Sequence, residues 1–206
     1  QLMSFVPVIH KVNSLSELEK IPKNYGVEID IRIENGTLCL SHDPIKNFED
    51  TTRLDNFLSE YEHMFIVANI KDSGIEEIVI EKLKKYTENF FLLDFEIPYL
   101  FNKDKNKNKY LSVRYSHFEK IEKNSKILNY VDWLWVDTFE KFPINDRNLN
   151  CLPELKKCLV SPERWGRKED INKIAQYLKN NNLNFELIMT NLTTVNDWKL
   201  ILDNKK

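Results

Sequence analysis

The fold of this chain is decided by one short stretch, Gly26-Val27-Glu28-Ile29-Asp30-Ile31-Arg32. Apolar and charged residues alternate in it, which is the period of a β-strand and places Glu28, Asp30 and Arg32 on one face. Such a face either lies in water on an ordinary surface hairpin or points inward. Two neighbouring carboxylates in a partly dry interior both stay ionised only beside a cation. The rest of the sequence favours the inward arrangement.

Short β-type runs alternate with helical patterns along the whole chain, as expected for parallel strands joined by crossover helices. We therefore predict an α/β fold, a compact (β/α)8 TIM barrel that forms a single domain over residues 1–206. That length is near the lower limit for the fold, so several helices must be short. The eight predicted strands cover residues 6–10, 27–32, 65–71, 90–94, 110–114, 133–137, 158–161 and 186–190.

A small hairpin is predicted after the second strand, because Asn35-Gly36 separates two β-type runs and Asn-Gly is a strong signal for a tight turn. The second run, residues 38–41, leads into Ser41-His42-Asp43-Pro44. Helices are predicted to begin at the capping box of Ser14 and Glu17 and after residues 73–74. Helical segments of only one or two turns are predicted after the fourth and fifth strands. The remaining helix predictions are residues 168–180 and 194–202, and the two short turns are residues 96–102 and 117–121.

The composition excludes several classes of protein. Thirty basic and thirty-two acidic residues give a formal charge of −2, so the chain has no overall positive field for nucleic acid. The basic run at residues 102–109 lacks interleaved aromatic residues and is predicted to be a solvated loop. No apolar run is long enough to span a bilayer.

Cysteine usage indicates a reducing compartment. The three cysteines are Cys39, Cys151 and Cys158, an odd number without the C-x-x-C spacing of a structural zinc site. A disulfide framework is therefore not expected, and the cytoplasm is the predicted location.

Polar residues lie at or near the carboxyl ends of the predicted strands, where TIM barrels carry their active sites. Glu28 and Asp30 suit a hard divalent cation, Mg²⁺ or Ca²⁺. His10 ends the first strand and His42 lies at the tip of the hairpin, so a general acid and a general base could flank one metal-bound group. Further strand-end candidates are Asn69, Lys71, Asp94, Arg114, Asp137, Glu163 and Thr190.

The order of these motifs resembles the glycerophosphodiester phosphodiesterase family, over roughly the first third of the chain. The resemblance implies a metal-dependent phosphodiesterase with a small-molecule substrate. Glu28 and Asp30 would be metal ligands, and His10 and His42 would share acid and base duties. Lys71 would contact the phosphate, and Lys11 would be a further phosphate contact. Arg114 and Glu163 are predicted as additional phosphate or substrate contacts from their positions at the strand ends of the predicted barrel. The motifs that carry the resemblance are His10-Lys11, Gly26-Val27-Glu28-Ile29-Asp30, residues 35–44 with their Ser41-His42-Asp43-Pro44 end, and Val67-Ala68-Asn69-Ile70-Lys71.

Two positions depart from the family pattern. Lys11 stands where the family usually has an arginine, which replaces a bidentate phosphate clamp with a point charge. Asn69 stands where the family usually has a third carboxylate, so the expected metal ligand is a neutral amide oxygen.

Two alternatives stay open at this point, a catalytically silent barrel that binds a phosphate-containing metabolite or partner, and a structural or assembly role. The alcohol groups on either side of the phosphate also remain open.

Overall fold

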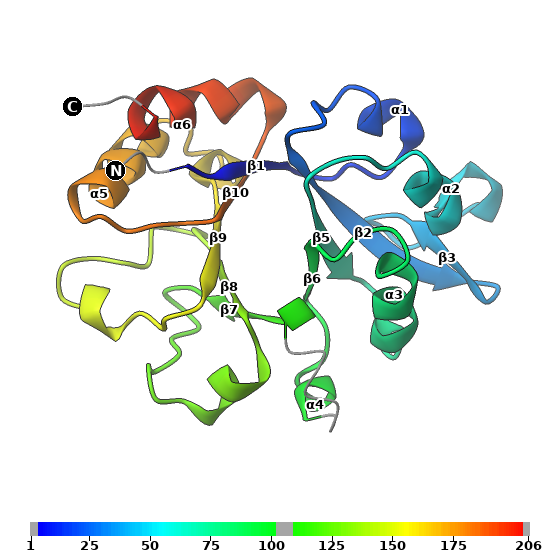
Figure 1. Cartoon of the computed structure of the whole chain (residues 1–206), viewed down its shortest axis with the longest axis horizontal. Coiled ribbons are helices and arrows are strands. Elements are labelled where there is room, and N and C mark those ends of the chain that lie inside the picture. The colour runs from blue at the N-terminus through cyan, green and yellow to red at the C-terminus, as the bar shows by residue number, and fades with distance from the viewer. Residues whose placement is uncertain (1–3, 102–108, 204–206) are drawn as a thin grey trace. The chain divides into compact units, whose positions relative to one another are not determined.

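The structure is a computed structural model that describes residues 4–101 and 109–203. The chain divides into two compact units (Figure 1). The N-terminal unit consists of residues 8–111, and the C-terminal unit consists of residues 1–7 and 112–206. Most of the predicted basic loop, residues 102–108, lies outside the described residues.

The sheet of the N-terminal unit consists mainly of parallel strands in the order β1-β2-β5-β6. β2 is the centre of this sheet, because Gly26 pairs with Val8 on one side and with Phe65 on the other. Valine, isoleucine and phenylalanine fill these strands, as expected for a sheet that is buried on both faces. The bounds are β1 Val6–Ile9, β2 Gly26–Glu34, β5 Phe65–Ile70 and β6 Phe90–Leu93.

The predicted hairpin is confirmed. β2 pairs antiparallel with β3 (Thr37–Leu40), and the turn residues Asn35 and Gly36 have φ angles of 50° and 73°. Those left-handed angles are the ones that a tight two-residue turn needs and that Asn and Gly accept most readily. A further short strand, β4 (Thr52–Arg53), pairs with β3 and was not expected from the sequence.

Short helices accompany these strands. Ser14 caps α1, since its side chain accepts a hydrogen bond from the backbone N–H of Glu17, which confirms the predicted N-cap. The Glu17 carboxylate accepts from the backbone N–H of Asn13 and the hydroxyl of Ser14, not from the backbone N–H of Ser14 as a full capping box would have it. α2 and α3 bury one apolar face each, through Leu54, Phe57 and Leu58 in α2 and Val79, Ile80 and Leu83 in α3. The bounds are α1 Leu15–Leu18, the 3-10 helix η1 Phe48–Asp50, α2 Leu54–Ser59, α3 Glu76–Leu83 and α4 Ile97–Leu100.

The C-terminal unit carries four more parallel strands in the order β7-β8-β9-β10. The backbone N–H of Val6 donates to the carbonyl oxygen of Glu186, beside β10. α5 and α6 lie side by side (Figure 1) and match the two predicted helices closely. The strand bounds are β7 Ser112–Tyr115, β8 Trp133–Val136, β9 Lys156–Val160 and β10 Leu187–Thr190, and the helices are η3 Lys126–Tyr130, η4 Leu149–Cys151, η5 Pro162–Trp165, α5 Asp170–Asn180, η6 Leu192–Thr194 and α6 Val195–Leu202.

All eight predicted parallel strands are present in the described residues, with ends shifted by at most two residues. The predicted helical turn at residues 117–121 is wrong. Ser116 Oγ instead accepts hydrogen bonds from the backbone N–H groups of Phe118 and Glu119, a local pattern that competes with helix formation. The result is a mixed α/β fold built on a large, mainly parallel sheet. Among the described helices, none has the length and apolar character of a membrane span.

Candidate active site

Glu28 and Asp30 point inward from β2. Glu28 is 2% exposed and Asp30 is fully buried, so the surface-hairpin alternative does not describe this strand. The burial follows from the position of β2, which is hydrogen-bonded along its length to β1, β3 and β5. Burying two carboxylates is costly unless each finds donors or positive charge, and the structure supplies both.

The carboxylate of Glu28 is held by the turn that follows β1 and by β5. One oxygen, Oε2, accepts a hydrogen bond of 2.8 Å from the backbone N–H of Lys11 and lies 3.6 Å from Nε2 of His10. The other oxygen accepts a hydrogen bond of 3.2 Å from the amide of Asn69. Lys11 has a φ of 55°, a left-handed conformation that is uncommon for lysine. That conformation accompanies the bond from its N–H to the acid.

Asp30 is fixed by an asparagine and paired with a lysine. The amide of Asn13 donates to Oδ2 over 2.8 Å, and the backbone N–H of Asp30 donates back to Oδ1 of Asn13. Nζ of Lys71 lies 3.1 Å from the second carboxylate oxygen, Oδ1. Lys71 follows β5 directly, and β5 is a parallel neighbour of β2, so Asp30 and Lys71 meet at the carboxyl end of these two strands.

The electrostatics of the pair are unusual. Burial raises the pKa of Glu28 to about 7, and the negative charge of Asp30 adds to the rise. The hydrogen bonds from Lys11 and Asn69 and the charge of Lys71 act in the opposite direction. Near neutral pH, the Glu28 carboxyl group is therefore close to its pKa, and a cation placed beside it would favour loss of the proton.

The residues at this point fit a hard cation. Oδ1 of Asp30 and Oδ1 of Asn69 are buried oxygens that accept no hydrogen bond, and the two residues are register partners on β2 and β5. Buried acceptors normally have a donor. Asp30 Oδ1 has the ammonium of Lys71 beside it and Asn69 Oδ1 has no donor among the described residues, so both oxygens are suited to a cation. The described residues contain no group of three His, Cys, Asp or Glu side chains suited to a metal. The third candidate ligand at this point, Asn69, is an amide and falls outside those four residue types.

His42 lies on the turn after β3, so its predicted place at the tip of the hairpin is wrong, because Asn35 and Gly36 form that tip. His42 is joined to β2 through its backbone. The backbone N–H of Ser41 donates to the carbonyl oxygen of Asp30, and the guanidinium of Arg32 donates to the carbonyl oxygen of His42. The imidazole is partly exposed, and its Nδ1 lies 2.7 Å from Oδ1 of Asp43. This contact orients the ring and leaves Nε2 as the nitrogen that can exchange a proton with a ligand.

The charges of Lys11 and Arg32 act on Asp43, which neighbours His42 on the turn after β3. The hydrogen bond with His42 holds the pKa of Asp43 below its usual value, and the positive charges of Lys11 and Arg32 act in the same direction. The structure therefore brings together most of the predicted site residues of the N-terminal unit. These are His10, Lys11, Glu28, Asp30, Asn69 and Lys71. His42 is connected to them through the backbone contacts of its turn with Asp30 and Arg32.

Two predicted residues, Arg114 and Glu163, belong to the C-terminal unit and form clusters of their own. Arg114 donates to the buried carboxylate of Asp137, which also accepts bonds from the indole N–H groups of Trp135 and Trp165. The Arg114 guanidinium lies 5.4 Å from the ring centroid of Phe139. Arg114 thus stands at the end of β7 beside an acid that compensates its charge.

The carboxylate of Glu163 accepts four hydrogen bonds. The donors are the hydroxyls of Ser161, Thr190 and Thr194 and the backbone N–H of Asn191. This bonding joins the loop after β9 to the loop after β10. It is the pattern of a carboxylate that holds two loops together.

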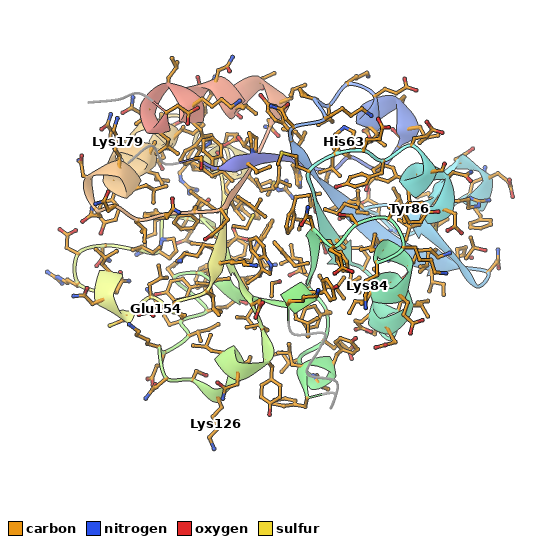
Figure 2. The ribbon with its side chains drawn as sticks, in the orientation of Figure 1. His63, Lys84, Tyr86, Lys126, Glu154 and Lys179 are labelled. Atoms are coloured by element: carbon orange, nitrogen blue, oxygen red, sulfur yellow. The ribbon has the colours of Figure 1, made fainter. Side chains whose placement is uncertain are left out.

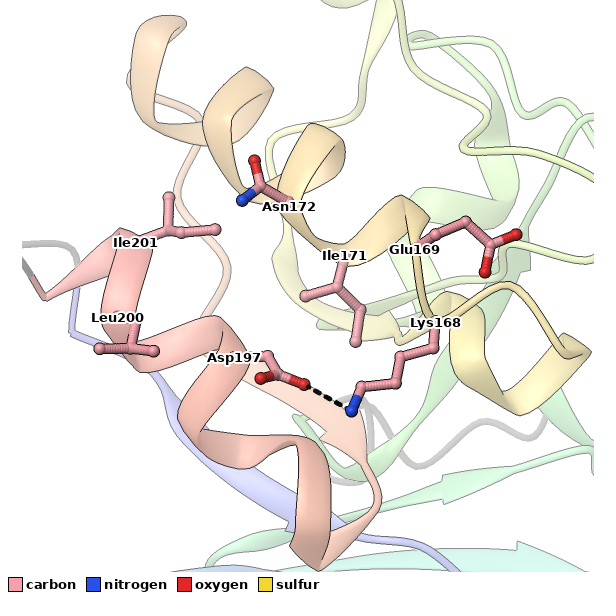
Figure 3. A pocket seen from close by; sticks show the side chains of 7 residues that line it. All are labelled: Lys168, Glu169, Ile171, Asn172, Asp197, Leu200 and Ile201. Atoms are coloured by element: carbon pink, nitrogen blue, oxygen red, sulfur yellow. Dashed lines mark ion pairs between the residues drawn. The ribbon is translucent and has the colours of Figure 1, made fainter.

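A cavity of about 530 Å³ lies between α5 and α6 (Figure 3). Ile171 and Leu200 form part of its wall, and Lys168 forms an ion pair of 3.3 Å with Asp197 at its edge. None of the predicted site residues lines it. The cavity therefore has no part in the candidate active site.

Asn13 and Asp72 contribute to the site and were not found by sequence reasoning. Asn13 holds Asp30, and Asp72 holds Arg32 through a bond of 2.8 Å. A single Asn in a loop carries no distinctive spacing. Asp72 does follow Lys71 directly, so the end of β5 was the one signal available.

Comparison with solved structures supports the fold. The chain is similar to the crystal structure of a glycerophosphodiester phosphodiesterase from Agrobacterium tumefaciens str. C58, with a TM-score of 0.61 and 11% sequence identity. The similarity covers 90% of this chain and 96% of that one. No protein-family model matches the chain, and no curated protein matches it. At this identity, the similarity describes the fold alone.

Proposed function

We propose that the chain is a metal-dependent phosphodiesterase that cleaves a glycerophosphodiester-like substrate by histidine acid–base catalysis. The observation that carries the proposal is the buried pair Glu28 and Asp30, with His10 within 3.6 Å of one of its oxygens. The fold shared with a glycerophosphodiester phosphodiesterase supports the same reaction class. The motifs of β2 and of the His42 turn support it as well.

Glu28, Asp30 and Asn69 would hold the cation, Mg²⁺ or Ca²⁺. Their oxygens are the ligands that both ions prefer, and amide oxygens are accepted in such sites. When bound, such an ion would supply positive charge beside the phosphate and would make a nearby hydroxyl or water more acidic. Asn13 keeps Asp30 in place through two hydrogen bonds of 2.8 Å.

The protein's own residues would move the protons and balance the charge. One of His10 and His42 accepts the proton of the nucleophile, which is a vicinal hydroxyl of the substrate or water. The other histidine protonates the leaving alkoxide. Lys71 and Lys11 would neutralise charge on the phosphate, with Arg114 as a further candidate for this role.

Histidine substitution in a phosphodiesterase assay tests this proposal. Purified protein is incubated with simple glycerophosphodiesters, and release of glycerol phosphate or a cyclic phosphate is followed with added Mg²⁺, with added Ca²⁺ and with EDTA. We expect metal-dependent release that falls at least about 10²-fold in His10→Ala and in His42→Ala. The matched control is His63→Gln, because His63 bonds the carbonyl oxygen of Ile21 and precedes β5, at the opposite end of that strand from Lys71. Full activity in both site variants would overturn the assignment.

A second candidate function is favoured by Asn69. Because its amide replaces an expected carboxylate, the site offers the cation less negative charge, and a silent barrel that binds a phosphate-containing metabolite would have this feature. Calorimetry with glycerol phosphate and each divalent ion separates the two functions. Binding without turnover favours the silent barrel, and turnover favours the enzyme.

We also propose that the eight parallel strands close into one (β/α)8 barrel and form a single domain. All four tryptophans lie in the C-terminal unit, so their fluorescence reports its unfolding, whereas far-ultraviolet circular dichroism reports both units. Coincident urea transitions are expected for one domain. Two separate transitions would contradict this proposal.

A further inference from the structure

The guanidinium of Arg32 bridges two segments that are far apart in the sequence. Its Nη1 donates to Oδ1 of Asp72 over 2.8 Å, and its Nη2 donates to the carbonyl oxygen of His42 over 3.1 Å. Arg32 lies on β2 on the same face as Glu28 and Asp30. The strand that carries the acids therefore also holds the histidine turn.

Asp72 is itself fixed. Its second oxygen accepts a hydrogen bond of 2.8 Å from the backbone N–H of Ile33, and Asp72 lies two residues beyond the end of β5. The side chains of Arg32 and Asp72 are 16% and 31% exposed, so water competes only in part for their contact. A lysine could not replace the arginine, because a single ammonium lacks the planar fork that reaches both acceptors.

The turn that carries His42 has few other supports. Ser41 binds the carbonyl oxygen of Asp30 through its N–H and the carbonyl oxygen of Asp43 through its hydroxyl, over 2.7 Å. The carbonyl of His42 depends on Arg32. With that bond in place, the backbone on both sides of the imidazole is fixed.

We propose that Arg32 and Asp72 form a positioning pair that holds the imidazole of His42 in the orientation needed for proton transfer. The inference rests on the proposed function for its catalytic part. Its structural part, that the pair immobilises the His42 turn, is independent of any activity. Because the pair acts on the backbone of His42 and not on substrate, its loss should lower kcat and leave KM nearly unchanged.

The test uses three variants of the full chain, Arg32→Lys, Asp72→Asn and the double variant. The control is Arg53→Lys, which makes the same change in a guanidinium that also binds backbone carbonyls, those of Phe48 and Thr51. Two quantities are measured. The first is the mobility of residues 41–43 by ¹⁵N relaxation and by the line width of the His42 ring signals, and the second is kcat and KM for a glycerophosphodiester.

We expect Arg32→Lys and Asp72→Asn each to mobilise the turn and to lower kcat on the order of 10²-fold, with KM changed less than about twofold. Because the two residues act as one unit, the double variant should lose little more than either single variant. Arg53→Lys should match the wild type in both measurements. An immobile His42 turn in Arg32→Lys, or an unchanged kcat, would overturn the proposal.

The test also separates this inference from the proposed function. If the wild-type protein has no phosphodiesterase activity, the proposed function fails and the relaxation measurement alone decides. A mobilised turn then supports the structural role of the pair, and an unchanged turn overturns it.

Discussion

Nζ of Lys71 lies 3.1 Å from Oδ1 of Asp30, a fully buried oxygen that accepts no hydrogen bond. The ammonium is the nearest positive charge that the structure gives to this acid. Two carboxylates and one ammonium leave the cluster with an excess of negative charge when Glu28 is ionised. The site thus depends on Lys71, on a proton or on a metal ion for its stability.

Removal of the Lys71 charge should destabilise the metal-free protein. In Lys71→Met, we expect the free energy of unfolding in EDTA to fall by about 3 kcal/mol, because a buried acid loses its partner. Urea denaturation measures the change. The control, Lys82→Met, removes an ion pair with the largely exposed Asp55 and should cost less than about 1 kcal/mol.

Addition of a third carboxylate should strengthen metal binding. In Asn69→Glu, the ion gains a charged ligand, so we expect its affinity to rise by about tenfold or more in calorimetry. Without metal, the same variant should be less stable than the wild type, since three acids then share one buried site. The matched control is Asn69→Gln, which keeps a neutral amide. Equal affinities in the two variants would show that residue 69 does not contact the ion.

Metal binding should depend on pH through Glu28. Its pKa is raised from 4.5 to about 7, so in EDTA its contribution to stability is present below pH 4.5 and is lost as the pH rises through 7. A bound cation displaces the proton and reverses this loss. We therefore expect the thermal shift produced by Mg²⁺ or Ca²⁺ to be larger at pH 8 than at pH 5. Glu28→Gln, which cannot titrate, should remove the pH dependence of the shift.

Stability should also depend on pH through His63, which is labelled in Figure 2. Its Nε2 lies 2.9 Å from the carbonyl oxygen of Ile21, and burial lowers its pKa from 6.5. The neutral ring is favoured in the fold, so its contribution is present above pH 6.5 and is lost as the pH falls through the lowered value. Urea denaturation from pH 8 to pH 5 should show a decline in the wild type that is smaller in His63→Gln, which cannot titrate at this position.

A methyl group at position 26 should disturb the start of β2. A Cβ atom on Gly26 would lie 2.9 Å from the carbonyl oxygen of Phe65 and 3.1 Å from a methyl group of Val8. We expect Gly26→Ala to cost about 1–3 kcal/mol by overpacking, as measured by urea denaturation. Gly36→Ala, where the added atom meets nothing within 4 Å but φ is +73°, should cost about 1 kcal/mol from backbone strain alone.

Much of the fold could be predicted because period-2 patterns and turn residues are local signals. The Asn35-Gly36 turn and the Ser14 N-cap are of this kind, and both are confirmed. Residues 117–121 could not be predicted, since the hydroxyl of Ser116 satisfies the backbone there in place of a helix. β4 was also missed, because its two residues are shorter than any periodic pattern.

The candidate site could be predicted where strand periodicity places charged residues on one face. The inward direction of Glu28 and Asp30 is confirmed by their burial. The contacts of Asn13 and Asp72 could not be read from the sequence, because each depends on a loop conformation. The partners of Arg114 and Glu163 depend on strand pairing between segments far apart in the chain.

The hydrogen bond from residue 11 to Glu28 comes from the main chain. A scan of single substitutions changes side chains, so at position 11 it will show mainly the effect of losing the lysine charge. Only exchanges that alter the left-handed backbone can reveal the peptide group as a contributor. Glycine or asparagine there should preserve the acid's environment, whereas a β-branched residue should disrupt it.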